Sequence, residues 1–185
     1  MMKEIRIHGR AGQGAITTAI LLVAAAVEDG KEALAFPHFG AERMGAPLNA
    51  YVRLSDAPIL LRTQIQQPDY LIILDPTLLW GFNISQGYRK GGRIIINTTM
   101  DTSKLCVSAP DQVVSVPAAE IAQELLGRAD RANTAILGAF AAATGEVTLE
   151  SLQKVARQRF SGVVGEKNAQ ALQRAYDLVK QREEA

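Results

Sequence analysis

Two short runs of aliphatic residues constrain the fold more than any other part of the chain. The segments DYLIILD (69–75) and GRIIINT (92–98) are apolar at nearly every central position. A strand with one buried face alternates apolar and polar residues, whereas a strand covered on both faces is continuously apolar. Each run therefore predicts a central strand of a parallel sheet that has structure packed on both of its faces.

The segments around these runs extend the same pattern. Further strands are predicted at 4–9, 32–36, 48–56 and 113–117, and helices at 15–27, 118–127, 133–145, 148–160 and 166–185. The 48–56 segment alternates apolar and polar residues, so we expect a half-exposed strand and a mixed sheet. We predict an α/β fold, in which a Rossmann-like, mixed but mostly parallel sheet is flanked by helices and followed by a C-terminal helical section. Residues 1–185 are expected to form a single domain.

Charge and cysteine content narrow the classes of function. The chain has 20 Lys and Arg residues against 19 Asp and Glu residues, so it offers no electrostatic case for binding nucleic acid or a membrane surface. No segment resembles a signal peptide, and the apolar runs are shorter than the roughly 20 residues that cross a bilayer. Cys106 is the only cysteine, which excludes an intramolecular disulfide or a Cys-rich metal site and favours a reduced, cytoplasmic compartment.

A glycine-rich turn joins the first predicted strand to the first predicted helix. The stretch HGRAGQGA (8–15) contains Gly9, Gly12 and Gly14. Such a turn presents backbone N–H groups at a helix N-terminus, where anions are favoured. The spacing is G-x-x-G-x-G, however, and the second predicted strand ends in AFPHF without a carboxylate for a ribose hydroxyl. A self-contained NAD site is therefore disfavoured, and the turn either packs a strand against a helix or contacts a ligand or partner chain.

A second loop carries aromatic, methionine and arginine side chains. Within AFPHFGAERMGAPLNAYVRLSD (35–56), prolines restrict the backbone and glycines relax it, which predicts an ordered loop rather than a helix. This composition is typical of an interface or a binding lip, and Arg43 can pair with a carboxylate or phosphate. The alternative is a loop closed by an internal Glu42–Arg43 ion pair that covers a sheet edge.

Other residues are assigned structural roles. No nucleophile accompanies His8 or His38, and no spacing resembles a metal site, so we predict no catalytic or metal-binding group. Asp75 follows a buried strand, where it is expected to line a crevice or to cap the next helix. Capping is the favoured interpretation. The remaining expectations are that Asn133 caps its helix, that Asn168 bonds a neighbouring loop, and that Trp80 and Phe82 lie in the core or an interface.

The order of these segments resembles the gamma subunits of the pyruvate:ferredoxin oxidoreductases, within the 2-oxoacid:ferredoxin oxidoreductase family. The stretches that carry the resemblance are GRAGQGA, DGKEALAFPHFGAERMGAPLNAYVRL, DYLIILDPTLL, NTAILGAF and EKNAQALQRAYD, which together span nearly the whole chain. The resemblance implies a complex that converts pyruvate, coenzyme A and oxidised ferredoxin reversibly into acetyl-CoA, CO₂ and reduced ferredoxin.

The resemblance also implies where the cofactors lie. Thiamine diphosphate with Mg²⁺ and the [4Fe–4S] clusters are expected on alpha, beta and delta (ferredoxin-like) partner subunits, because this chain has one cysteine and lacks a G-D-G…N motif. The isolated chain is expected to bind none of these cofactors and to be inactive, and a homodimer is one form that it can take. Coenzyme A is the co-substrate near which this subunit is expected to close.

Residues that match the family's loops are expected to bind coenzyme A or a partner subunit. They are Gly9, Arg10, Gly12, Gln13, Gly14, Phe39, Gly40, Glu42, Arg43, Gly45 and Pro47. Arg10 and Arg43 are the expected contacts for an anionic group of coenzyme A or for a partner chain. The stretch FGAERMGAP is closer to the pyruvate branch, with a 2-oxoglutarate or branched 2-oxoacid branch as the alternative. The competing functions are a stand-alone nucleotide-binding or NAD(P)-dependent oxidoreductase, and a scaffold relative that has lost its complex.

Overall fold

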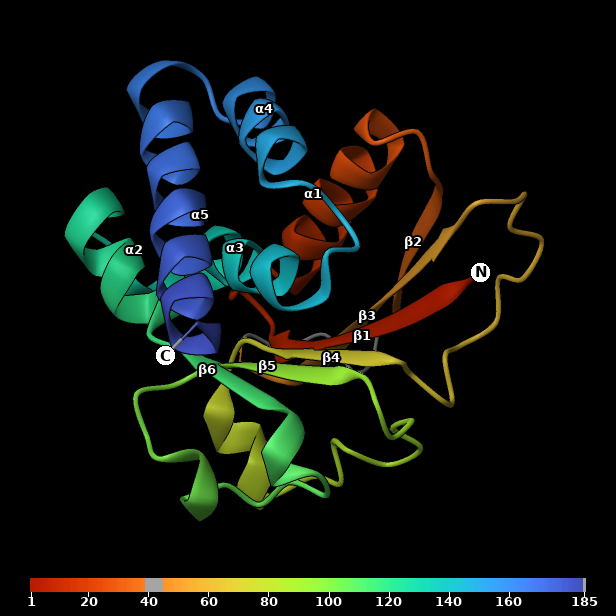
Figure 1. Cartoon of the computed structure of the whole chain (residues 1–185). Helices are drawn as coiled ribbons and strands as arrows, with labels where there is room; N and C mark the ends of the chain where they lie inside the picture. Colours follow the sequence, from red (N-terminus) through yellow and green to blue (C-terminus); the bar gives the residue numbers. More distant parts are fainter. Residues whose placement is uncertain (39–44, 185) are drawn as a thin grey trace.

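A six-stranded sheet forms the centre of the protein in the computed structural model, which describes residues 1–38 and 45–184 (Figure 1). Its strands are β1 (Lys3–Arg10), β2 (Glu32–His38), β3 (Pro47–Ser55), β4 (Tyr70–Ile73), β5 (Arg93–Asn97) and β6 (Val113–Val116). The spatial order is β2-β3-β1-β4-β5-β6. β3 runs antiparallel to both of its neighbours, whereas β1, β4, β5 and β6 are parallel, which confirms the mixed, mostly parallel sheet.

The antiparallel strand β3 separates β2 from β1. Arg10 at the end of β1 is paired with Pro47 at the start of β3, and His38 at the end of β2 is paired with Asn49. Since neighbouring strands are spaced by about 4.8 Å, β2 lies about 10 Å from β1. The end of β2 is therefore not beside the glycine-rich turn that follows β1.

The helices of the described residues cover one face of the sheet, and loops with short 3-10 turns cover the other (Figure 1). They are α1 (Ala15–Glu28), α2 (Ala118–Leu126), α3 (Ala132–Thr144), α4 (Leu149–Arg159) and α5 (Gly162–Glu183). The 3-10 turns on the loop-covered face are η1 (Pro76–Trp80), η2 (Thr102–Lys104) and η3 (Pro110–Gln112), whereas η4 (Ala129–Arg131) joins α2 to α3 on the helical side. α5 begins four residues before its predicted start at 166, because the predicted pattern began after Gly165.

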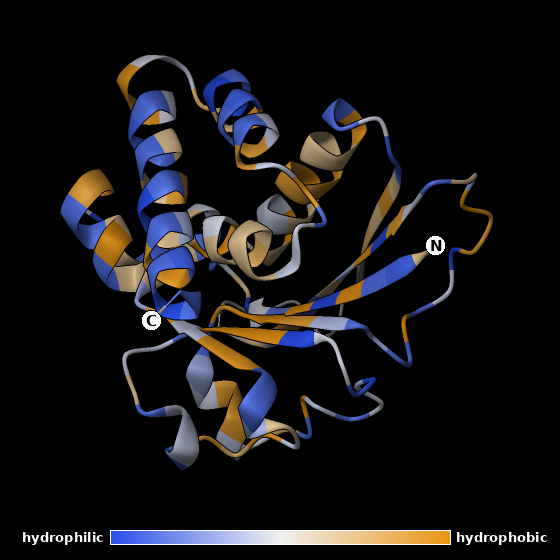
Figure 2. Ribbon diagram, viewed as in Figure 1, coloured by the Kyte–Doolittle hydropathy of each residue, from blue (hydrophilic) through white to orange (hydrophobic). Residues whose placement is uncertain are grey.

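Both faces of the central strands are buried, as the continuous aliphatic runs predict. Ile72 and Ile95 belong to the larger core under the helices, whereas Leu71 and Ile94 belong to a smaller core under η1 and its neighbouring loops. Figure 2 shows the central strands as largely hydrophobic and α4 and α5 as rich in hydrophilic residues. Within the described residues, no helix combines the length and the apolar character that a membrane crossing requires.

Polar side chains lie on the face of β1 that points away from the helices. Arg53 of β3 donates from Nε to Oε1 of Glu4 at 2.9 Å, and Arg6 donates from Nε to Nε2 of His8 at 3.0 Å. Burial, and then the charge of Arg6, lower the pKa of His8 to about 3 even though a side-chain hydrogen bond with Asn49 opposes the shift. His8 is therefore neutral at ordinary pH and serves as an acceptor for a buried guanidinium.

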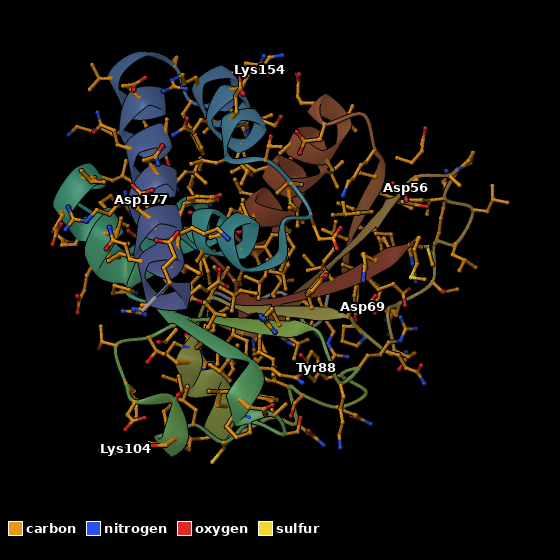
Figure 3. The ribbon with its side chains drawn as sticks, viewed as in Figure 1. Asp56, Asp69, Tyr88, Lys104, Lys154 and Asp177 are labelled. Carbon is orange, nitrogen blue, oxygen red and sulfur yellow. The ribbon has the colours of Figure 1, made fainter. Side chains whose placement is uncertain are left out.

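The surface near η1 departs from one expectation. Trp80 and Phe82 are 55% and 52% exposed, so they do not lie in the core, and a role in an interface stays a prediction. Figure 3 shows the side chains of the described residues, with Lys104 and Tyr88 on the loop-covered side and Lys154 and Asp177 on the helical side.

Candidate functional site

The glycine-rich turn is the connection between β1 and α1. Gly12 and Gly14 have φ values of 98° and 81°, a region that residues with a side chain rarely adopt. Gly14 is the N-cap residue of α1 and no side chain caps that helix. A Cβ atom on Gly14 would lie 2.8 Å from Cγ of Asn133 on α3, which is too close. Gly14 is therefore required both by its backbone conformation and by the close approach of α3.

One side of the turn is held by four residues that we call the Asp75 cluster: Arg10, Gln13, Asp75 and Thr77. Oδ2 of Asp75 accepts hydrogen bonds from Arg10 Nε at 3.0 Å and from Gln13 Nε2 at 2.8 Å. Oδ1 accepts from the N and Oγ1 atoms of Thr77 at 2.9 and 2.6 Å. The second pair confirms that Asp75 caps the next helix, η1, and the four bonds together use the acceptor capacity of the carboxylate.

The electrostatics of the Asp75 cluster keep Asp75 ionised. Burial acts to raise the pKa of Asp75, but the hydrogen bonds from Thr77 and Gln13 and the positive charge of Arg10 outweigh burial, so the pKa lies below its usual 3.8. Because its oxygens are already engaged, this carboxylate beside the turn is not available to bind a ribose hydroxyl. That finding agrees with the expectation that the turn does not hold NAD in the manner of a dinucleotide-binding fold.

The same side of the turn is joined to the second loop. Arg10 donates from Nη1 to the carbonyl oxygen of Gly45 at 3.1 Å, and the N–H of Ala11 donates to the oxygen of Ala46 at 2.9 Å. The structure thus brings Gly9, Arg10, Gly12, Gln13 and Gly14 together with Gly45 and Pro47. The other predicted site residues, Phe39, Gly40, Glu42 and Arg43, lie outside the described residues.

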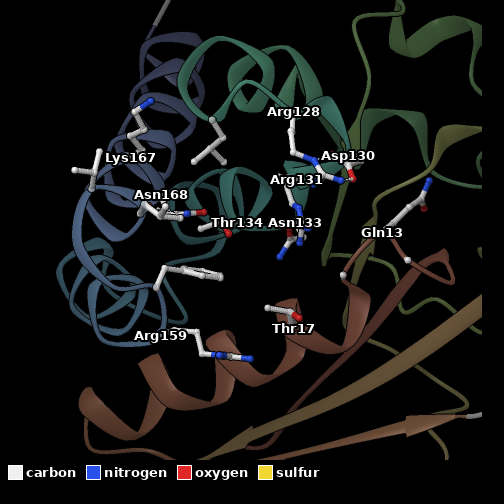
Figure 4. A pocket seen from close by; sticks show the side chains of 16 residues that line it. Gln13, Thr17, Arg128, Asp130, Arg131, Asn133, Thr134, Arg159, Lys167 and Asn168 are labelled. Atoms are coloured by element: carbon white, nitrogen blue, oxygen red, sulfur yellow. Dashed lines mark hydrogen bonds and ion pairs between the residues drawn. The ribbon is translucent and has the colours of Figure 1, made fainter.

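The opposite side of the turn borders a pocket of about 550 Å³ (Figure 4). Its walls come from the turn and the start of α1, from the connection between α2 and α3, and from the connection between α4 and α5. The lining residues used below are Gly12, Gly14, Thr17, Arg128, Asp130, Arg131, Asn133, Arg159, Phe160, Val163 and Lys167. Figure 4 shows Arg159 extending toward Thr17, whereas the side chain of Gln13 is directed away from the pocket.

The charged side chains that line the pocket are mostly cationic. Four of them, Arg128, Arg131, Arg159 and Lys167, stand against the single carboxylate of Asp130. Arg128 is paired with Asp130 at 3.0 and 2.7 Å. The other three make no salt bridge with any residue that the structure describes. Together with the uncapped N-terminus of α1, this excess of positive charge favours a ligand with several phosphate charges.

An apolar wall lies beside these cations. Phe160 and Val163 line the pocket, and the guanidinium of Arg159 lies 6.0 Å from the centre of the Phe160 ring. Val163 is 71% exposed, so it presents an apolar surface at the rim of the pocket. A pocket that combines an aromatic face with several cations suits a flat base that carries phosphates.

Sequence reasoning missed most of this pocket and misassigned two of its residues. Asn133 does not cap its helix, because α3 begins at Ala132 and Asn133 instead packs against Gly14. Asn168 does not bond a neighbouring loop, since its Nδ2 donates to the oxygen of Val164 in its own helix at 2.8 Å. The only sequence signal was basic residues beside predicted helix ends, in GRADRAN and RQRFSG.

The described residues do not form a metal or iron–sulfur site. Within residues 1–38 and 45–184, no three His, Cys, Asp or Glu side chains are grouped so that they could hold a metal ion. Cys106 is a single exposed thiol, whereas an iron–sulfur cluster requires several thiolates. The donor set of this chain therefore does not fit a cluster of its own.

Comparisons with known proteins give a consistent result. The family model described as pyruvate ferredoxin/flavodoxin oxidoreductase matches residues 4–178. A pyruvate synthase subunit PorC from Methanosarcina barkeri is 50% identical, over 97% of this chain and 98% of the relative. A pyruvate/ketoisovalerate oxidoreductases common subunit gamma from Thermococcus kodakarensis is 46% identical, over 95% and 96% of the two chains. The crystal structure of the pyruvate oxidoreductase subunit PORC from Thermotoga maritima matches with a TM-score of 0.82 and 35% identity, over 95% and 96% of the two chains.

Proposed function

The chain belongs to the pyruvate ferredoxin/flavodoxin oxidoreductase family, and from that premise we propose that it is the gamma subunit of a multisubunit 2-oxoacid:ferredoxin oxidoreductase. The complex oxidatively decarboxylates pyruvate in the presence of coenzyme A, gives acetyl-CoA and CO₂, and passes the electrons to ferredoxin, and it also runs in reverse. Relatives named for pyruvate support this substrate, at 50% and 46% identity. A branched 2-oxoacid is the second candidate, because one of those names also contains ketoisovalerate.

In this proposal the chain supplies a binding surface rather than the reacting groups. Thiamine diphosphate, Mg²⁺ and the [4Fe–4S] clusters are carried by alpha, beta and delta-type partner subunits, and the complex is cytoplasmic. The absence of a fitting donor set among the described residues agrees with that division of labour. The whole chain acts as one gamma-type domain in contact with those partners.

The cationic pocket carries the proposal that this chain binds coenzyme A. Coenzyme A has an adenine ring and three phosphate groups, which match the apolar wall at Phe160 and the cations Arg131 and Arg159, neither of which makes a salt bridge with a described residue. Gly14 and Thr17, at the N-terminus of α1, line the same pocket, and a helix N-terminus favours anions. The predicted contacts of Arg10 and Arg43 with coenzyme A or a partner chain stay predictions, and three of the five N–H groups of Arg10 already bind its own chain.

Calorimetry with the isolated chain tests the binding proposal. We expect coenzyme A to bind with a micromolar dissociation constant, dephospho-coenzyme A to bind more weakly, and NAD(H) to show no comparable heat. Micromolar binding of NAD(H) without binding of coenzyme A would instead support a stand-alone nicotinamide-dependent enzyme. Purification of the native protein tests the subunit proposal separately, because the chain should then copurify with thiamine diphosphate and iron–sulfur partners. A single band would contradict it.

A further inference from the structure

The carboxylate of Asp75 makes more hydrogen bonds than capping a helix requires. Capping η1 uses only Oδ1 of Asp75, through the N–H of Thr77. Oδ2 is directed to the other side, toward Arg10 and Gln13, and the residue is only 9% exposed. Asp101 provides a comparison, because it caps η2 through Ser103 in the same way, and no hydrogen bond to a distant described residue is found for it. One oxygen of Asp75, Oδ2, thus binds residues of the glycine-rich turn rather than η1.

The side chain of Gln13 links the Asp75 carboxylate to the backbone of the turn. Its Nε2 donates to Asp75, while its Oε1 accepts from the backbone N–H of Arg10 at 2.7 Å. The N–H of Gln13 in turn donates to the oxygen of Arg10 at 3.0 Å. The amide of Gln13 therefore has one orientation that satisfies both neighbours, and this orientation fixes the direction of the peptide groups between residues 10 and 14.

Arg10 extends the same constraint to the second loop. Its guanidinium donates to Asp75, to the oxygen of Gly45 and, at 3.0 Å, to Oγ1 of Thr77. The planar fork of an arginine holds three such partners in fixed relative positions. The glycine-rich turn, the start of β3 and the start of η1 are consequently tied to one carboxylate.

From these contacts we propose that Asp75 is a positioning residue, which acts through Gln13 and Arg10 to orient the glycine-rich turn toward the cationic pocket and to hold residues 45–47 against it. The consequence for binding rests on the proposed function, since it assumes that coenzyme A occupies the pocket. The effect on the turn itself does not rest on it. Asp75 contacts no ligand in this proposal, and its influence on binding is indirect.

Asp75→Asn is the principal test, because it changes the charge and the hydrogen-bond pattern with little change in volume. The new amide can still cap η1 with its oxygen, but its NH₂ group then faces donors from Arg10 and Gln13. Flipping the Gln13 amide does not repair the mismatch, because its NH₂ group would then face the N–H of Arg10. We expect hydrogen exchange at the N–H groups of Arg10 and Gln13 to accelerate about tenfold, and coenzyme A binding to weaken about tenfold.

A double variant supplies the rescue that a purely structural role would not predict. In Asp75→Asn with Gln13→Glu, the carboxylate moves to position 13, where one oxygen accepts from the N–H of Arg10 and the other accepts from the new amide. Net charge equals that of the wild type. We expect most of the exchange protection and most of the affinity to return. Exchange at the N–H of Thr18, which donates to Gly14 within α1, serves as an internal reference.

Asp101→Asn is the matched control, since it alters the cap of η2 but leaves the turn untouched. The proposal is overturned if Asp75→Asn and Asp101→Asn lower the melting temperature alike while neither changes exchange in the turn. It is also overturned if the double variant fails to restore protection. If the wild type does not bind coenzyme A, the proposed binding of coenzyme A by this chain fails, whereas the exchange measurements still decide whether Asp75 positions the turn.

Discussion

The two sides of the glycine-rich turn differ in how their charges are satisfied. On the Asp75 side, Arg10, Gln13, Asp75 and Thr77 are bonded to one another or to the backbone. On the pocket side, Arg131, Arg159 and Lys167 have no salt-bridge partner within the part of the chain that the structure describes. Paired charges order a backbone, whereas unpaired cations in a pocket are available to a ligand. One turn is thus ordered from one side and presented to a ligand on the other.

The largest expected effect comes from adding a side chain at Gly14, where the turn and α3 approach each other closely. Gly14→Ala places a Cβ atom 2.8 Å from Cγ of Asn133 and also strains a positive φ. We expect the free energy of unfolding in urea to fall by about 3 kcal/mol, as a sum of backbone strain and overpacking. Coenzyme A binding should be lost as well, because the clash would displace the turn and Asn133, which both line the pocket.

Gly30→Ala is the matched control for this variant. Gly30 has a similar φ of 80°, but no atom lies within 4 Å of the added Cβ. It should cost about 1 kcal/mol, from backbone strain alone. Adding Asn133→Ala to Gly14→Ala should recover part of the loss. Equal costs for Gly14→Ala and Gly30→Ala would show that α3 does not press on the turn.

The next largest effect should come from removing the unpaired cations. Because Arg131 and Arg159 lack salt-bridge partners among the described residues, their joint replacement by alanine should leave urea stability nearly unchanged. Coenzyme A binding should nevertheless weaken about 30-fold, since charge-assisted contacts to phosphate are lost. Lys104→Ala removes a cation from the opposite side of the molecule (Figure 3) and is the control. A comparable loss of affinity in that control would contradict a site-specific role for the pocket.

A pH titration probes His8, which is buried on the face of β1 that points away from the helices. The pKa of His8 is about 3 in the folded protein and 6.5 in the unfolded chain, so the unfolded chain binds more protons between these values. Stability should be complete above pH 6.5 and should fall as the pH decreases through this window, by at most about 1.4 kcal/mol per pH unit. The pKa of Asp75, which is also lowered, adds a loss below pH 3.8.

His8→Gln should remove the first part of this pH dependence, because glutamine can still accept from Arg6 and does not titrate. Urea unfolding at pH 7 and pH 5.5 should show the wild type losing about 1 kcal/mol more than the variant. Identical losses in the two proteins would mean that His8 accepts a proton in the folded state without difficulty.

The smallest predicted effect concerns the one carboxylate in the pocket. Asp130 is paired with Arg128, so it shields one cation and repels a phosphate. Asp130→Asn should therefore bind coenzyme A about threefold more tightly in calorimetry. Because the pair is exposed, the melting temperature should hardly change. Weaker binding would show that Asp130 contacts the ligand directly.

Local sequence pattern was sufficient for the sheet and the longer helices. The continuous runs in β4 and β5 correctly predict strands that are buried on both faces. The expectation of a half-exposed strand was wrong for β3, because its residues 50–55 are all buried. Its polar side chain Arg53 is buried in an ion pair with Glu4 rather than exposed to solvent. The 3-10 turns escaped prediction because segments of three to five residues are too short to show a helical period. The glycine-rich turn was recognisable because its residue type is tied to its backbone conformation.

The pocket was not predictable in the same way because its walls meet only in the tertiary structure. Arg131 and Arg159 stand at the ends of different helices, and nothing in the spacing between them indicates that both line the same pocket. Asn133 was interpreted as a cap because asparagine favours that position, but η4 shifts the start of α3 to Ala132. The side chain of Asn133 packs against Gly14 instead of capping the helix.

The position of β3 also limits how this scaffold can change its ligand. In a dinucleotide-binding fold, one acidic substitution at the end of the second strand is enough to select a ribose, because that strand adjoins the first. Here position 38 is paired with Asn49 on β3, and Asn49 is paired with His8 on β1. A carboxylate gained at the end of β2 would be one strand too far from the turn. Acquiring a nicotinamide specificity would therefore require the strand order to be rebuilt, which is not accessible to point mutations.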